Sequence, residues 1–265
     1  MTGKPSTTHT PAPTTLRDRI TQIKERIAAA CAKAKRDPSE ITLVTVSKYA
    51  APELIRESLA FGLTDLGENR VPQLVQRAAQ INEYHTRRLA SDGEGFGKKL
   101  RWHMVGHLQR NKVKQLLPAV SLIHSVDSLR LAEEIDTQAG RLEKKISILL
   151  QVNASEESQK SGIAVGAVVA LAEQIDTMEN IQIAGLMTMA QHGAAESDIR
   201  HTFSRVREIY DEMKFQKIGK QHLRHLSMGM TDDFEMAILE GATIVRIGSA
   251  IFGGLSDAAE QPEED

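Results

Sequence analysis

ITLVTVSK, at Ile41–Lys48, is a run of apolar and β-branched residues that ends abruptly in a lysine. Such a run is typical of a strand in a parallel sheet, where helices cover both faces and no polar alternation is needed. A helical pattern, Pro52–Phe61, follows it directly. A strand that leads at once into a helix predicts an α/β fold.

The same unit recurs along the chain. Seven further strand runs are predicted at Thr64–Gly67, Trp102–Val105, Leu122–Val126, Ile146–Val152, Ile183–Met187, His225–Ser227 and Ile244–Ile247. Helical patterns lie between them, among them Leu129–Leu142, Val165–Thr177, Glu196–Met213 and Asp232–Leu239. Eight such units predict a single (β/α)8 TIM barrel, with an open doubly wound sheet as the main alternative.

The ends of the chain differ from its middle. Residues 14–254 are predicted to form the barrel domain, which begins with an extra N-terminal helix that Thr15 caps. Its apolar face comprises Leu16, Ile20, Ile23, Ile27 and Cys31. Residues 1–13, rich in Thr and Pro, are predicted to be a disordered extension, and residues 255–265 an acidic tail. The polar, Gly-rich segment Ser91–Lys99 reads as a surface loop before the third strand.

Composition narrows the classes of partner. The chain has 265 residues, with 33 Lys and Arg against 35 Asp and Glu and only 4% aromatic residues. This balance does not favour nucleic acid as a partner, because neither a strong positive field nor stacking aromatics are present. No apolar run is long enough to span a membrane, and no secretory signal is seen, so a cytoplasmic location is expected. A single Cys31 precludes an intrachain disulfide.

Lys48 is the first candidate for chemistry. It follows the first strand directly, and the carboxyl ends of barrel strands form the active-site face. Partial burial there would lower the pKa of the amine and supply the neutral form that attacks an aldehyde. The alternative is an ordinary surface lysine just past a strand.

Two loops near the C-terminus have the composition of a phosphate site. HLSMGMT supplies Ser227, Gly229 and Thr231, and IVRIGSAIFG supplies Gly248 and Ser249. Barrels commonly bind phosphate between the loops after strands seven and eight, where backbone N–H groups and hydroxyls converge. Each glycine could equally serve a tight turn.

Arg246 lies inside the eighth predicted strand, on the same side as Ile244 and Gly248. If that side faces the lumen, the buried guanidinium needs an acceptor, and a pyridine nitrogen would serve. Because arginine stays protonated, such a nitrogen would remain unprotonated and the ring would be a poor electron sink. The alternative is pairing with a buried acid.

Two polar residues stand near other strand ends. Asn69 follows the second strand and can hydrogen-bond a ligand at the same face, and His103 lies within the third strand, where it can point into the barrel. His103 and His107 have the spacing of a metal pair. That spacing places two ligands together only on a helix, so no metal is expected.

The motifs together resemble the pyridoxal phosphate homeostasis protein family, over roughly residues 16–253. The segments that carry the resemblance are VTVSKYA, LGENRV, WHMVGHLQRNK, HSVDS, LLQVNASEESQKSG, GLMTMA and LSMGMTDDFEMAILEGATIVRIGSAIFG. The resemblance implies the fold of the alanine racemase N-terminal barrel, fold type III among proteins that bind pyridoxal 5′-phosphate (PLP). It implies a Schiff base on Lys48, a pyridine-nitrogen contact from Arg246, and Asn69, His103 and Met187 around the ring. Phosphate contacts are implied for Ser227, Gly229, Thr231, Gly248 and Ser249.

The resemblance implies a carrier or regulator of vitamin B6 supply, with no catalytic residues, and with apo forms of PLP-dependent enzymes as possible recipients. The main alternative is a PLP-dependent racemase or lyase. A racemase needs a second proton donor, which in alanine racemases is a tyrosine from a further domain, and this chain ends soon after the barrel. Without that domain, a monomer is expected. The third alternative is a barrel that binds another phosphate ligand noncovalently.

Overall fold

The computed structural model describes residues 15–92, 99–155 and 161–255. The predicted extension at residues 1–13 lies outside the described residues, as does the predicted acidic tail apart from Leu255. The predicted loop Ser91–Lys99 begins too early, because its first two residues still belong to a helix, α3 (Val71–Asp92). The helix continues because no glycine or proline interrupts it before Gly93.

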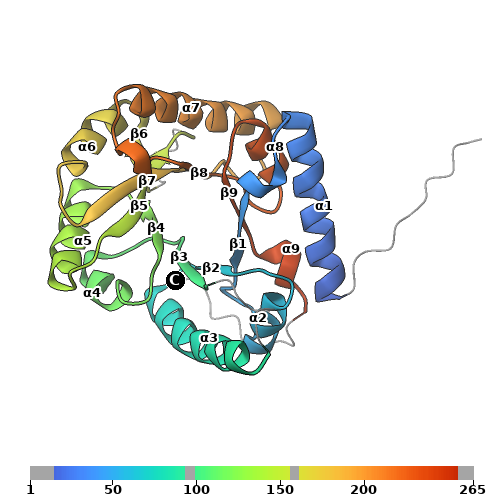
Figure 1. Ribbon diagram of the computed structural model, residues 1–265. Helices are drawn as coiled ribbons and strands as arrows, with labels where there is room; N and C mark the ends of the chain where they lie inside the picture. Colours follow the sequence, from blue (N-terminus) through green and yellow to red (C-terminus); the bar gives the residue numbers. More distant parts are fainter. Residues whose placement is uncertain (1–14, 93–98, 156–160, 256–265) are drawn as a thin grey trace, which may run out of the picture.

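Nine strands form one sheet in the described part of the chain, and every pairing is parallel. The order is β4-β3-β2-β1-β9-β8-β7-β5-β6, and an additional pairing of β4 with β5 closes all but β6 into an eight-stranded barrel (Figure 1). The barrel strands are β1 (Thr42–Val46), β2 (Asp65–Glu68), β3 (Arg101–Met104), β4 (Leu122–Val126), β5 (Ile146–Asn153), β7 (Ile181–Met187), β8 (His225–Ser227) and β9 (Ile244–Ile247). The predicted (β/α)8 barrel is confirmed.

Each predicted strand lies within two residues of its observed bounds. The short strand β6 (Ile163–Ala164), which pairs with the end of β5, was not predicted, because two residues give no periodic signal. The helices form a ring outside the strands (Figure 1). Besides α3 they are α1 (Leu16–Ala34), α2 (Pro52–Leu59), α4 (Val113–Leu116), α5 (Leu129–Arg141), α6 (Val168–Ile175), α7 (Glu196–Phe215), α8 (Phe234–Leu239) and α9 (Ser249–Phe252).

The extra N-terminal helix α1 is confirmed. The hydroxyl of Thr15 accepts a hydrogen bond from the backbone N–H of Asp18 at 3.2 Å, which caps the first turn. The helix lies beside α8 and α9 (Figure 1), where Arg26 pairs with Glu235 at 2.6 Å. Lys35, with φ of 55°, ends the helix in the left-handed conformation. α1 therefore covers the outside of the segment that joins the last two barrel strands.

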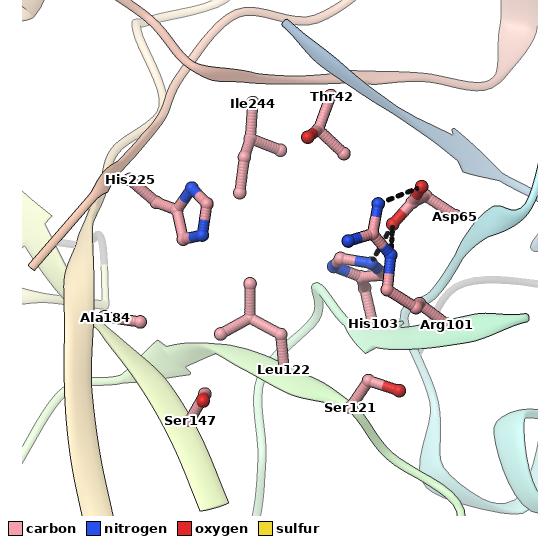
Figure 2. A pocket seen from close by; sticks show the side chains of 10 residues that line it. All are labelled: Thr42, Asp65, Arg101, His103, Ser121, Leu122, Ser147, Ala184, His225 and Ile244. Carbon is pink, nitrogen blue, oxygen red and sulfur yellow. Dashed lines mark hydrogen bonds and ion pairs between the residues drawn. The ribbon is translucent and has the colours of Figure 1, made fainter. Parts of the chain in front are cut away.

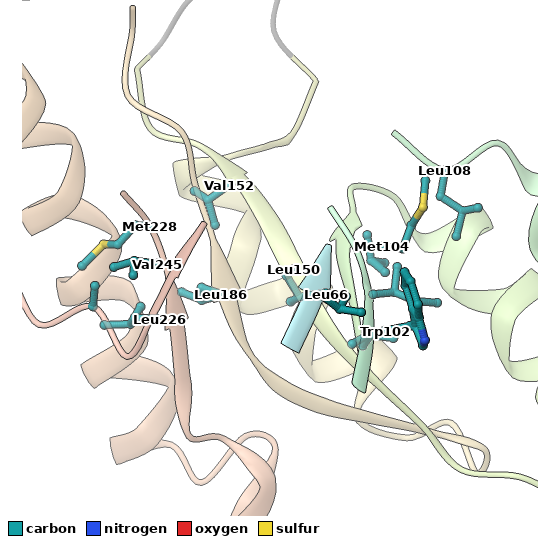
Figure 3. Packing of buried hydrophobic residues seen from close by; sticks show 14 of the residues in the cluster. Leu66, Trp102, Met104, Leu108, Leu150, Val152, Leu186, Leu226, Met228 and Val245 are labelled. Atoms are coloured by element: carbon teal, nitrogen blue, oxygen red, sulfur yellow. The ribbon is translucent and has the colours of Figure 1, made fainter. Parts of the chain in front are cut away.

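Side chains alternate between two apolar cores. The larger core lies between the outer faces of the strands and the helices, and it includes Leu66, Trp102 and Val245 (Figure 3). The smaller core fills the lumen and consists of Val44, Leu122, Leu149, Ala184, Met187 and Ile244. Along β9, Ile244 belongs to the lumen and Val245 to the outer core, as the period of two in a strand requires. Any polar side chain with the parity of Ile244 is therefore held inside the barrel.

Candidate cofactor site

Arg246 lies inside the barrel. Its side chain points to the same side of β9 as Ile244, a member of the lumen core, and only 4% of Arg246 is exposed. Its guanidinium donates to the hydroxyl of Ser227 at 2.6 Å and to the backbone carbonyl of Thr188 at 2.9 Å. Burial lowers the pKa of Arg246 to about 10, and the nearby Asp233 partly opposes the shift. The side of β9 that carries Arg246 thus faces the lumen, which the sequence left open, and the observed acceptors of the guanidinium are a hydroxyl and a carbonyl.

The two glycine-containing loops meet at the carboxyl ends of β8 and β9. The hydroxyls of Thr231 and Ser249 lie 2.9 Å apart. Gly229 has a φ of +93°, and a Cβ there would lie 2.6 Å from the Cβ of Ala237. Gly248 packs just as closely, since its Cβ would lie 2.8 Å from the carbonyl oxygen of Val46. Both glycines are therefore required by the close packing that brings the hydroxyls together.

Lys48 lies in a turn just past β1, at the same end of the barrel. The N–H of Ala50 bonds the carbonyl of Ser47 at 2.9 Å, which turns the chain away from the strand. Lys48 is exposed, and its ammonium nitrogen lies 4.6 Å from the ring centroid of Tyr49. The expectation that Lys48 is partly buried is wrong, because the wall of the barrel ends before it.

A buried ion pair holds this turn in place. Arg77, on α3, contacts the carboxylate of Glu68 at 2.5 Å, and the side chain of Glu68 is fully buried. The same guanidinium donates to the backbone carbonyls of Ser47 and Ala50, on either side of the turn. The hydroxyl of Ser47 also donates to Glu68, at 2.5 Å. Arg77 was not predicted from the sequence, because nothing local marks the helix residue that reaches a neighbouring loop.

The remaining predicted residues lie at different depths. Asn69 is partly buried in the bend after β2, and its backbone carbonyl packs so closely on Gly106 that a Cβ there would lie 2.2 Å away. Met187 is the last residue of β7, is 1% exposed, and pairs in register with Ser227. His103 lies lower in the lumen, where its ring contacts Asp65.

The amino-terminal end of the lumen holds a second polar cluster (Figure 2). His103 lies 2.9 Å from a carboxylate oxygen of Asp65, and Arg101 pairs with the same carboxylate at 2.7 Å. Burial alone would raise the pKa of Asp65, but the hydrogen bonds from His103 and Arg101 outweigh it and lower that pKa. These groups line a hollow of about 140 Å³, into which the ring of His225 also points.

Asp65 and His124 were not recognised as site residues from the sequence. A usable signal existed, because each is a charged or polar residue inside a buried strand and points to the same side of that strand as a lumen residue.

Among the described residues, no group of three His, Cys, Asp or Glu side chains is arranged to hold a metal ion. None of the described helices is both long and apolar enough to cross a membrane.

The chemistry available at the carboxyl-terminal mouth suits one kind of ligand. The parallel pairing of β1 with β9 places Val44 opposite Arg246, so the turn that carries Lys48 begins beside the Gly248 loop. An accessible primary amine can react with an aldehyde, and paired hydroxyls over tightly packed glycines can bind a phosphate. A buried guanidinium can donate to a ring nitrogen. Pyridoxal 5′-phosphate carries all three of these groups: the aldehyde, the phosphate and the ring nitrogen.

The comparisons with known proteins agree on the family. The family described as "Alanine racemase, N-terminal domain" matches residues 13–256. A curated relative from Aquifex aeolicus, called "Pyridoxal phosphate homeostasis protein", is 38% identical over 89% of this chain and 96% of its own length. A crystal structure of an unknown protein from Bifidobacterium adolescentis is 35% identical, with a TM-score of 0.83, over 89% of this chain and 94% of that one. The structure of PipY from Synechococcus elongatus with PLP bound is 32% identical, with a TM-score of 0.72, over 88% of this chain and all of that one.

Proposed function

Because the chain belongs to the alanine racemase N-terminal domain family and, within it, to the pyridoxal phosphate homeostasis proteins, we propose that it binds PLP. Its role is in PLP homeostasis, as a carrier or regulator of the cofactor. The observation that carries the proposal is the convergence of Lys48, Arg246 and the Thr231–Ser249 hydroxyl pair at one end of the barrel. The relative PipY, 32% identical, has been solved with PLP bound.

Each residue has a distinct part in holding the cofactor. Lys48 would form the covalent Schiff-base link, because an amine outside the wall of the barrel is open to an incoming aldehyde. Thr231 and Ser249 would bind the phosphate, with Gly229 and Gly248 allowing the close approach, and Ser227 would position Arg246. Bound PLP supplies an electron-withdrawing ring.

Arg246 would contact the pyridine nitrogen. Its guanidinium cannot accept a hydrogen bond and keeps its proton, so it would leave that nitrogen unprotonated. Asn69, just past β2, and Met187, at the end of β7, would flank the ring from opposite sides of the barrel. His103 is the exception among the predicted ring contacts, because its hydrogen bond to Asp65 holds it toward the amino-terminal half of the lumen.

We propose further that the protein works without turnover, and that apo forms of PLP-dependent enzymes receive the cofactor. The relatives are named for homeostasis and not for a reaction, and the alternative of a racemase or lyase is not favoured. Incubation of the PLP-loaded protein with an L-amino acid in deuterated water tests this point: we expect no exchange of the α-proton. Steady exchange would contradict it. A monomer and a cytoplasmic location remain predictions.

Titration with PLP, followed by absorbance, tests the binding proposal. The wild type should develop a band at about 420 nm, the usual region for this chromophore linked to a lysine, and Lys48→Ala should not. Lys144→Ala is the matched control, because Lys144 is exposed on the loop before β5, at the opposite end of the barrel. A wild-type protein that stays colourless, or a Lys48→Ala variant that colours normally, would overturn the assignment.

Pyridoxal, which lacks the phosphate, tests the phosphate loops separately. The wild type should bind PLP more tightly than pyridoxal. In Thr231→Ala this preference should shrink, because one of the two hydroxyls that lie 2.9 Å apart is lost. An unchanged preference in the variant would remove Thr231 from the proposed phosphate site.

A further inference from the structure

A continuous chain of hydrogen bonds crosses the lumen from the predicted cofactor site to the opposite mouth. It joins five side chains on five strands, and none of these five residues is more than 7% exposed. The links are Arg246 Nη1 to Ser227 Oγ at 2.6 Å, Ser227 Oγ to His124 Nδ1 at 2.9 Å, His124 Nε2 to His103 Nδ1 at 3.0 Å, and His103 Nε2 to Asp65 Oδ1 at 2.9 Å.

The two ends of the chain fix the direction of every bond in it. The carboxylate of Asp65 can only accept, so Nε2 of His103 must carry a proton. When both histidines are neutral, Nδ1 of His103 accepts from Nε2 of His124, and Nδ1 of His124 accepts from the hydroxyl of Ser227. The oxygen of Ser227 is then free to accept from Arg246, which can only donate. Every donor in the chain therefore has an acceptor, and all bonds run from the guanidinium to the carboxylate.

One added proton would reverse part of this chain. With one added proton, the two histidines carry three ring protons between them. His103 then donates from both nitrogens, so His124 must accept at Nε2 and donate from Nδ1 to Ser227. The proton comes from solvent and is gained by the pair. The hydroxyl of Ser227 would then receive two hydrogen bonds and direct its own proton away from His124.

Burial opposes that protonation. It lowers the pKa of His124 well below 6.5, and the charges of His103, Arg246 and His225 act in the same direction. Burial also lowers the pKa of His225, with His103 contributing. The remaining charged groups that face the chain are Asp65 and Arg101 at its lower end and Asp233 near Arg246. Asp65, on β2, is the anion that lies in hydrogen-bond contact with the ring of His103.

We propose that His103 and His124 are positioning residues for Arg246: through Ser227 they hold its guanidinium in place, and one proton added to the pair from the amino-terminal mouth puts a second donor on the Ser227 oxygen and so loosens that hold. The inference rests on the proposed function, because Arg246 is assigned there to the cofactor ring. It adds a role for the lower half of the lumen, which otherwise contributes nothing to binding. His103 reaches the hollow in Figure 2, so a proton can arrive there from solvent.

Three variants separate the positioning of Arg246 from the protonation of the histidine pair. The dissociation constant of PLP is measured for each between pH 5.5 and 8. His124→Phe breaks this line of hydrogen bonds and should weaken binding about tenfold at pH 8, because the buried hydroxyl of Ser227 loses its acceptor. His124→Asn places an amide where Nδ1 lies, so it should restore most of the affinity but remove the extra weakening at low pH. His107→Phe is the control, because His107 is exposed outside the lumen, and it should follow the wild type.

The cofactor's own titration is common to all four proteins and cancels in their ratios. If His124→Phe binds PLP like the wild type at every pH, the proposed role is wrong even though PLP binding stands. If the wild type does not bind PLP, the proposed function fails instead. Nitrogen-15 NMR of the ligand-free wild type at pH 8 then still tests the line of hydrogen bonds: each histidine should carry its proton on Nε2, and a proton on Nδ1 of His124 would overturn the proposal.

Discussion

Two predicted PLP contacts, Lys48 and Arg246, are held in opposite ways although Arg246 lies on β9 and Lys48 lies just past the neighbouring strand β1. Arg246 is 4% exposed, and a hydroxyl and a carbonyl bind its guanidinium. Lys48 is exposed. Arg77 donates to the backbone carbonyls on either side of Lys48 and makes no hydrogen bond to its amine. The difference teaches that the residue proposed for recognition is fixed in advance, whereas the residue proposed for the covalent link stays accessible to an aldehyde.

The largest effect on stability should come from the support beneath Lys48. Arg77→Ala would leave the carboxylate of Glu68 buried without its cation, which costs about 3 kcal/mol of unfolding free energy. Arg87→Ala is the matched control, because it breaks an exposed pair with Glu83 on the same helix and should cost less than about 1 kcal/mol. Urea denaturation measures both. Equal losses in the two variants would show that the buried pair does not hold the turn.

A smaller loss should come from the phosphate loops. Gly229→Ala introduces a Cβ that lies 2.6 Å from the Cβ of Ala237, at a φ of +93°. We expect a loss of about 2 kcal/mol and weaker PLP binding, because the Thr231 loop must move. Gly166→Ala meets no atom within 4 Å and has an ordinary φ, so it should change neither. A Gly229→Ala protein that is as stable as the wild type would contradict the packing described here.

The buried histidines should make stability depend on pH. Burial lowers the pKa of His124 in the folded protein, so below about pH 6.5 this residue binds a proton more readily in the unfolded chain than in the folded protein. Stability should therefore fall as pH decreases through this range, by at most roughly 1.4 kcal/mol per pH unit for each such histidine. His225 acts in the same direction. Asp65 does not contribute there, because its lowered pKa keeps it ionised.

Urea denaturation of the wild type and His124→Asn, at steps from pH 7.5 to 5.5, measures this dependence. The variant should lose stability less steeply than the wild type. Parallel curves would mean that His124 has the same pKa in the folded and unfolded protein.

The smallest effect on stability should come from the residue with the largest effect on binding. Lys48→Met removes an exposed side chain, so the free energy of unfolding should change by less than about 0.5 kcal/mol while covalent PLP binding is lost. Denaturation with and without PLP measures both effects. A loss of several kcal/mol without PLP would show that Lys48 has a structural role and would remove the contrast with Arg246.

The sequence predicted the strands better than the site. The period of two placed Arg246 on the same side of its strand as Ile244, because side-chain alternation is a local property, and the structure shows that this side faces the lumen. The burial of Lys48 was predicted wrongly, since a turn of two residues decides it. The chain from Asp65 through His124 could not be predicted, because it depends on which lumen side chains of β2, β4 and β8 meet across the barrel. That meeting is set by strand register and stagger, which leave no pattern within any single strand.

The most direct test of the central claim is to locate the covalent link. The protein is incubated with PLP, reduced with borohydride, digested, and the modified peptide is identified by mass spectrometry. We expect one stoichiometric label, on Lys48, that disappears in Lys48→Ala without moving to another lysine. A label on a different lysine, or no label on a protein that still binds PLP, would contradict it.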